Sequence, residues 1–229
     1  MKKLSVSITR REAIWGWGYL LFQIFFLPVI LTMVNMQLPS PMPEAKVNFV
    51  YFLLNFLSIL AIAHQFLWDS LRIALRSPFR CLRAAFLGLV LYFACNILFS
   101  NLIVRIRPDF ININDNSISA MTQGYFALVS IGTIFLVPPA EEFLYRGLVF
   151  GLLYNKNKFL AYGVSTVLFS AIHVVGYIGS YDLELLLLCF IQYIPAGICL
   201  AWAYASADTI FAPILMHITI NQIGMQAMR

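Results

Sequence analysis

Residues 183–204 read LELLLLCFIQYIPAGICLAWAY, an apolar run with a single charged side chain, Glu184. The hydrocarbon core of a bilayer is about 30 Å thick, and a helix of roughly 20 apolar residues crosses it. This run is therefore long enough to span a membrane. Other runs of similar length and character are 13–36, 47–67, 84–104, 124–155, 159–178 and 209–227. We predict an all-α fold, a polytopic transmembrane helix bundle.

The fourth of these runs, 124–155, is unusually long and contains Pro138-Pro139. Proline has no backbone N–H and clashes with the preceding turn, so the pair either kinks one helix or divides it into two. We therefore predict seven spans, with eight as the alternative. The polar stretch 105–123 is expected to be the longest loop.

The overall composition favours a lipid environment. Of the 229 residues, 61% are hydrophobic and 11% are charged, with a mean hydropathy of +0.83. Soluble domains are about 45–50% apolar and about 25% charged. The net charge is +5, but the basic residues form short clusters between apolar runs. No basic stripe interleaved with stacking aromatics is present, so we expect no nucleic-acid partner.

The basic clusters also predict an orientation, because short cytoplasmic loops are enriched in Lys and Arg. With the N-terminus inside, ten basic residues fall in cytoplasmic segments and four in outside segments. The inside set is Lys2, Lys3, Arg10, Arg11, Arg72, Arg76, Arg80, Arg83, Lys156 and Lys158, and the outside set is Lys46, Arg105, Arg107 and Arg229. We expect an integral multi-pass protein of the plasma membrane with a cytoplasmic N-terminus.

Three charged residues, Glu141, Glu142 and Arg146, lie inside the fourth run. Each costs about 2.5–3.5 kcal/mol at the centre of a membrane helix, so a helix that only spans has no use for them. Glu142 and Arg146 are four residues apart, the spacing of a local ion pair. Glu141 is rotated about 100° from Glu142 and can face a different neighbour. A buried network that fixes helix packing is the alternative.

Further polar groups lie in two later runs. His173 lies in 159–178, and His217 and Asn221, four residues apart, share one helical face of 209–227. At about 1.5 Å per residue, Glu141 and His173 are each about 21 Å from the cytoplasmic ends of their runs, and Asn221 is about 18 Å deep. We expect these groups, with the shallower His217, to converge within the membrane.

Three motifs resemble those of one protein family. They are EExxxR at residues 141–146, FxxxH at residues 169–173 and HxxxN at residues 217–221. In this order, on separate apolar runs, they are similar to the CPBP (Abi-like) family of CaaX prenyl proteases of type II and bacteriocin-processing intramembrane proteases. Tyr145 stands where Phe is usual. The resemblance covers roughly 124–227, so we predict an N-terminal three-span region, 1–123, and a CPBP-like catalytic core, 124–229.

The resemblance implies hydrolysis of a peptide bond near the membrane. Glu141 would act as general base on a water molecule, helped by His173. His217 and Asn221 would donate hydrogen bonds to the oxyanion of the tetrahedral intermediate. A peptide or protein at the membrane is the implied substrate, and CaaX proteins, bacteriocin leaders and pro-peptides all suit the site.

Glu142 and Arg146 would support these catalytic groups. The residues themselves do not decide whether a metal takes part, because Glu141, His173 and His217 are competent Zn²⁺ ligands of the His₂Glu type. We favour a site without a cofactor, with zinc as the alternative.

The main functional alternative is a non-hydrolytic membrane protein for immunity or regulation, which would bind a peptide or membrane partner. The sequence lacks the signatures of other intramembrane peptidase classes: it has no HExxH zinc motif, no GxSG and no GxGD. A base, two imidazoles and an amide together favour chemistry over binding alone.

Overall fold

The computed structural model describes residues 3–229, and within that range it contains helices and no β-strand. The predicted all-α class is confirmed. The α-helices and the two π-helical segments, η1 and η2, follow one another as α1 Arg10–Phe25, α2 Leu27–Met36, α3 Glu44–Ile62, α4 His64–Arg76, α5 Pro78–Ile106, α6 Ile113–Ile131, η1 Gly132–Leu136, α7 Val137–Glu142, η2 Phe143–Phe150, α8 Gly151–Tyr154, α9 Lys158–Val175, α10 Leu183–Ala207 and α11 Phe211–Ala227.

The chain is a polytopic membrane bundle, but it has fewer clear spans than the seven predicted. By length and composition five helical stretches of the described chain can cross a membrane, or up to six if α1 and α2 form one broken span. Those two helices meet at 45° beside Phe26, just before Pro28 removes a backbone donor. The last helix, α11, has only 17 residues, fewer than the roughly 20 that cross a 30 Å core.

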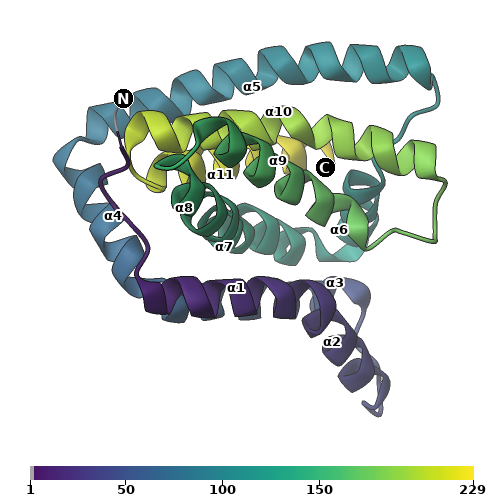
Figure 1. The fold of residues 1–229 in the computed structure, drawn as a ribbon. Helices are drawn as coiled ribbons and strands as arrows, with labels where there is room; N and C mark the ends of the chain where they lie inside the picture. The colour runs from purple at the N-terminus through teal and green to yellow at the C-terminus, as the bar shows by residue number, and fades with distance from the viewer. Residues whose placement is uncertain (1–2) are drawn as a thin grey trace.

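Figure 1 shows α5 along one edge of the molecule with α10 beside it, and α1 along the opposite edge, from which α2 projects. Helix α10 packs against both α5 and α9, and α11 packs against α5. The short α7 is in contact with α3 and α11, and η2 is in contact with α1, α9 and α10. The segment that carries the EExxxR motif therefore lies inside the bundle, surrounded by helices from both halves of the chain.

The fourth run is one long helical stretch from Ile113 to Tyr154. Its break falls at residues 123–125, where Gly124 has φ of 99°, a conformation that other residues rarely adopt. The stretch expected as a loop, 105–123, is thus helical from Ile113 onward. At Pro138-Pro139 the helix continues, but the five residues of η1 before it widen to π-helical geometry.

Glu12 fixes the first helix to the junction between α3 and α4. Its Oε2 accepts hydrogen bonds from the backbone and hydroxyl of Thr9 at 2.9 and 2.7 Å, a capping box for α1. Its Oε1 accepts from the backbone N–H of Phe66 at 2.8 Å. One buried carboxylate therefore satisfies donors at the starts of two helices and holds α1 against the bundle.

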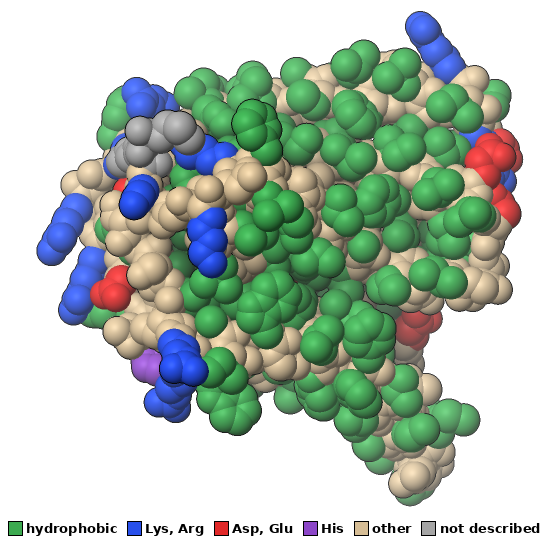
Figure 2. All heavy atoms as spheres, viewed as in Figure 1, with side chains coloured by type: hydrophobic (Ala, Val, Ile, Leu, Met, Phe, Trp, Pro, Cys, Tyr) green, Lys and Arg blue, Asp and Glu red, His purple; other side chains and the backbone are tan. Residues whose placement is uncertain are grey.

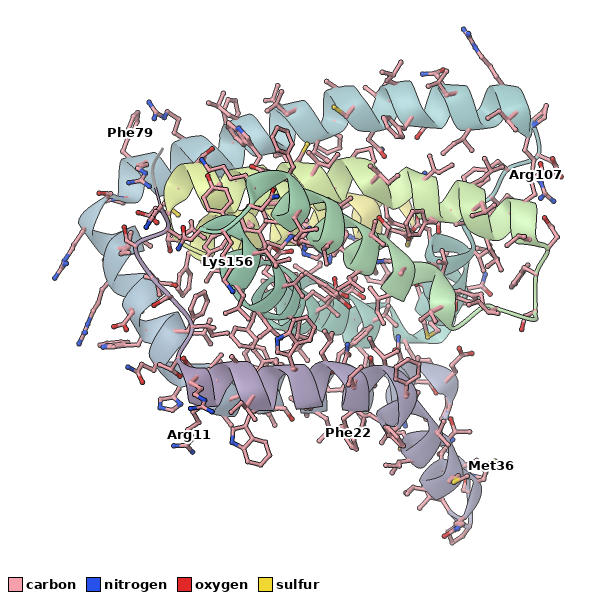
Figure 3. The ribbon with its side chains drawn as sticks, viewed as in Figure 1. Arg11, Phe22, Met36, Phe79, Arg107 and Lys156 are labelled. Atoms are coloured by element: carbon pink, nitrogen blue, oxygen red, sulfur yellow. The ribbon has the colours of Figure 1, made fainter. Side chains whose placement is uncertain are left out.

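The surface has the character of a membrane protein. Figure 2 shows hydrophobic side chains over most of the visible face, with Lys and Arg gathered toward one end. Phe159, 91% exposed, and Phe79, 77% exposed, belong to this apolar surface. Figure 3 places Arg11 and Lys156 near one end of the bundle and Arg107 at the other. The end with Arg11 and Lys156 is the one predicted to be cytoplasmic.

Candidate functional site

Glu142 and Arg146 form the ion pair expected from their spacing. Arg146 Nη1 donates to Glu142 Oε1 at 3.0 Å, and neither side chain is exposed. A second guanidinium nitrogen donates to the carbonyl of Gly197 on α10 at 3.3 Å, and the guanidinium lies 4.1 Å from the ring centre of Phe169 on α9. The pair therefore ties the fourth span to α9 and α10.

His217 is held by the same carboxylate. Its Nδ1 donates to Glu142 Oε1 at 2.8 Å, from α11. In the neutral ring this bond places the proton on Nδ1 and leaves Nε2 as an acceptor. Nε2 faces Glu141, 4.0 Å from its Oε2. Glu142 thus orients the imidazole, and the opposite edge of the ring is presented to Glu141.

His173 is oriented in the same way by a different acceptor. Its Nδ1 donates to the carbonyl of Phe169, one turn earlier on α9, at 2.8 Å. The ring stacks on Tyr193 of α10 with centroids 4.0 Å apart and planes 26° from parallel. Tyr193 in turn donates to Asp115 at 3.1 Å. The neutral ring of His173 therefore leaves Nε2 free to accept a proton.

Asn221 contacts the π-helical segment before the proline pair. Its amide nitrogen donates to the carbonyl of Thr133 at 2.8 Å. In a π-helix that carbonyl would accept from residue 138, but Pro138 has no N–H. The backbone N–H of Val137 already bonds to Gly132. Pro138 therefore frees a carbonyl that Asn221 satisfies, and one amide hydrogen of Asn221 remains for another acceptor.

One cavity of about 480 Å³ joins these groups. Glu141, His173, His217 and Asn221 all line it, while Glu142 and Arg146 lie behind this wall. The four predicted catalytic side chains are thus brought together, from three helical segments, inside the bundle. One carboxylate oxygen of Glu141, Oε2, is buried and makes no hydrogen bond to any described residue. It is free to accept a proton or a hydrogen bond from a molecule in the cavity.

The proposed zinc ligands do not fit a metal ion in this arrangement. Among residues 3–229, no three His, Cys, Asp or Glu side chains are grouped so that they could hold one. We derive no step through a metal.

The cavity also has a polar wall that the motifs did not reveal. Gln23 of α1 and Tyr51 and Asn55 of α3 line it. Tyr51 donates to the Gln23 side-chain oxygen at 2.8 Å, and the Asn55 amide donates to the Tyr51 carbonyl at 2.9 Å. The signal was present in the sequence, because uncharged polar residues in apolar spans usually face a bundle interior or a cavity.

Comparison with known proteins agrees with the motifs. Residues 123–223 match the family described as Rce1-like, type II CAAX prenyl endopeptidase. A Bacillus subtilis (strain 168) protein named "Putative membrane peptidase YdiL" is 31% identical over 109 residues, 47% of this chain and 40% of that protein. The "UPF0177 protein YxdF" of Lactococcus lactis subsp. lactis (strain IL1403) is 31% identical over 94 residues, 41% of this chain and 46% of that protein.

The match therefore spans less than half the length of each of these curated relatives. No solved structure matches the chain. The matched segment contains all three motifs and coincides closely with the range 124–227 over which they predicted the resemblance. Residues 123–223 of this chain are therefore similar to the Rce1-like family of type II CAAX prenyl endopeptidases.

Proposed function

We propose that this protein is an intramembrane endopeptidase that hydrolyses a peptide bond of a membrane-associated substrate. The observation that carries the proposal is the convergence of Glu141, His173, His217 and Asn221 on one cavity inside a membrane bundle. A site for binding alone has no need of two imidazoles held with a free nitrogen beside an unpaired carboxylate oxygen. The matched family and the name of the Bacillus relative support peptidase chemistry.

Glu141 acts as general base in this proposal. Its unpaired Oε2 takes a proton from a water molecule as the water oxygen attacks the scissile carbonyl carbon. His173, with Nε2 unprotonated, lines the same cavity and helps to orient the water. When the C–N bond breaks, the proton passes to the leaving amine. Hydrolysis is then complete, and Glu141 returns to its carboxylate form.

His217 and Asn221 stabilise the oxyanion in this proposal, under conditions that the geometry defines. Asn221 has one amide hydrogen beyond the bond to Thr133. His217 can donate from Nε2 only when the ring is protonated, because Nδ1 already donates to Glu142.

Glu142 and Arg146 act as positioning residues for the catalytic groups. The chain divides into a three-span region, 1–123, and a catalytic core, 124–229. The N-terminus is cytoplasmic and the membrane is the plasma membrane. The substrate is a CaaX-type protein, a bacteriocin leader or another pro-peptide. We favour catalysis by protein groups alone over catalysis by zinc.

Co-expression with candidate peptide precursors tests the proposal. The intact protein should convert one precursor into two fragments that mass spectrometry identifies, and Glu141→Ala should leave it whole. Equal cleavage by both proteins would remove Glu141 from the chemistry. Binding of a precursor without cleavage would favour the immunity or regulatory alternative.

A further inference from the structure

Tyr145 is a polar residue in the cavity to which no role has been assigned. It lies in η2, four residues after Glu141, and is 1% exposed. Its side chain lines the same cavity as Glu141. The hydroxyl makes no hydrogen bond to any described residue. An unpaired buried hydroxyl destabilises a protein, so its presence calls for an explanation.

The neighbours of this hydroxyl leave its hydrogen free to donate. Tyr51 and Glu141 interact with the hydroxyl electrostatically, and Gln23 lies within hydrogen-bonding reach of it. The side-chain oxygen of Gln23 already accepts from Tyr51 at 2.8 Å, so Gln23 can offer the Tyr145 oxygen only an amide hydrogen. Phenylalanine would fill nearly the same volume without a polar atom, so packing alone does not require a hydroxyl here. The Tyr145 side chain lines the cavity together with Glu141, one helical turn earlier.

The donors expected for the oxyanion are already partly engaged. His217 uses Nδ1–H on Glu142, and Asn221 uses one amide hydrogen on the carbonyl of Thr133. A tetrahedral intermediate is stabilised by donors that are fixed in place and have no other partner. The hydroxyl of Tyr145 meets both conditions, since its ring is packed edge-on against Phe169 with centroids 5.6 Å apart.

We propose that the Tyr145 hydroxyl is a further catalytic donor, which donates a hydrogen bond to the carbonyl oxygen of the scissile peptide bond. This assignment rests on the proposed function. As the water oxygen bonds to carbon, the carbonyl π electrons move to the oxygen and the phenol holds the resulting negative charge. When the C–N bond breaks, those electrons return to form the new carboxyl carbonyl. Tyr145 keeps its proton throughout, and Glu141 carries out the proton transfer.

Tyr145→Phe tests the assignment, because it removes only the oxygen atom. With a peptide that the wild type cleaves, we expect kcat to fall by about 10²–10³-fold, the usual effect of losing one oxyanion donor. KM should change little, since the bond strengthens mainly in the transition state. The thermal midpoint of the purified variant in detergent should rise, because a buried unpaired hydroxyl is gone.

Tyr204→Phe is the matched control. Tyr204 is also 1% exposed and its hydroxyl also has no partner among the described residues, but it lies in α10 outside the cavity lining. This variant should likewise gain thermal stability, while its kcat stays at the wild-type value. Comparing the two variants distinguishes the effect of losing any buried hydroxyl from the effect of losing the hydroxyl that lines the cavity.

Several outcomes would overturn the assignment. An unchanged kcat in Tyr145→Phe would show that the hydroxyl does not touch the reacting carbonyl. A shift of the acid limb of the pH–rate profile at an unchanged plateau would show that Tyr145 acts through Glu141 instead. A lower thermal midpoint would mean that the protein itself satisfies the hydroxyl. A wild type that cleaves no peptide contradicts the proposed function, whereas equal cleavage by wild type and Tyr145→Phe contradicts this assignment alone.

Discussion

At the residue scale, Glu142 has two partners for a single oxygen. Its Oε1 accepts from Arg146 at 3.0 Å and from His217 at 2.8 Å, and all three side chains are buried. Removing one member of a buried charged group leaves the others uncompensated in a medium of low dielectric. Glu141, by contrast, lines the cavity and has one oxygen that makes no hydrogen bond to any described residue. The two adjacent carboxylates should therefore respond differently to the same substitution.

Glu142→Gln should lower the free energy of unfolding by about 3–5 kcal/mol, because Arg146 loses its buried counter-charge. Glu141→Gln should leave stability close to the wild-type value and slow peptide cleavage by about 10²–10⁴-fold, since the amide cannot take a proton from water. Thermal melting in detergent and a cleavage assay on both variants make the comparison. Equal melting points for the two variants would show that Glu142 is not the structural carboxylate.

The sequence predicted the contacts that depend on one helix and not those that depend on several. The Glu142–Arg146 pair follows from a four-residue spacing and was found. The bond from His217 to Glu142 depends on how α11 is rotated in the bundle, which no local pattern determines. The sequence suggested His217 as an oxyanion donor or a Zn²⁺ ligand and did not predict its bond to Glu142. It likewise suggested Asn221 as an oxyanion donor and did not predict the bond from its amide to the carbonyl of Thr133.

At the element scale, α9 and α10 approach closely at Gly197. A Cβ added there would lie 2.7 Å from Thr166 Cγ2 and 3.1 Å from the Thr166 backbone Cα. Gly197 also supplies the carbonyl to which Arg146 donates. The absence of a side chain at this position therefore allows the fourth span, α9 and α10 to meet behind the site.

Gly197→Ala should lower the free energy of unfolding by about 1–3 kcal/mol, the usual effect of overpacking. Gly163→Ala on α9 is the control, because a Cβ there meets nothing within 4 Å. That change should be neutral or stabilise the helix by up to about 1 kcal/mol. Melting curves of both variants provide the measurement. A Gly197→Ala protein as stable as Gly163→Ala would contradict the close approach.

The loop before α10 should respond to pH. The pKa of the Asp182 carboxyl is lowered from 3.8, first because the backbone N–H of Leu185 donates to it and then because Arg107 pairs with it at 3.0 Å. A carboxyl with a lower pKa in the folded state stabilises the fold above its unfolded pKa. That contribution is lost as the pH falls through the folded value, below about pH 4.

Asp182→Asn should therefore flatten the decline of the melting temperature below about pH 4. Asp109→Asn is the control, since Asp109 is 80% exposed and lies 3.6 Å from the same arginine without capping a helix. It should keep the wild-type pH dependence. Melting temperatures between pH 7 and pH 3 decide the question, and identical curves for wild type and Asp182→Asn would reject the role of this carboxyl.

The element boundaries show why the number of spans was overestimated. Hydropathy identifies apolar runs but does not register the bend between α1 and α2 at Phe26, or that the helix in the last run, α11, has only 17 residues. The proline pair was expected to kink or divide the fourth run. The helix instead continues through both prolines, because the preceding residues of η1 adopt the wider π-helical geometry. The polar residues Gln23 and Asn55 are visible in the sequence of the first two apolar runs. Nothing in the sequence, however, indicated which side of each helix faces the site.

At the scale of the whole molecule, the two ends of the bundle differ in charge. Arg11 and Lys156 lie near one end and Arg107 lies at the other (Figure 3). Short cytoplasmic loops are enriched in basic residues, so the first end should face the cytoplasm. The apolar surface between the ends fits a protein that crosses the bilayer several times.

Reporter fusions test this orientation. Reporters at the N-terminus and within 70–83 should be active only as cytoplasmic reporters, and those within 107–112 only as extracytoplasmic ones. A reporter that places 70–83 outside the cytoplasm would reverse the orientation of the whole bundle.

The most direct test of the account is cleavage of one identified peptide by purified protein after complete removal of metal ions. We expect the chelated wild type to cleave at its original rate, with Glu141→Gln slower by about 10²–10⁴-fold, the usual contribution of a general base. Mass spectrometry of the fragments gives both rates. Wild-type activity in Glu141→Gln would contradict the account, and so would loss of activity on chelation that added zinc restores.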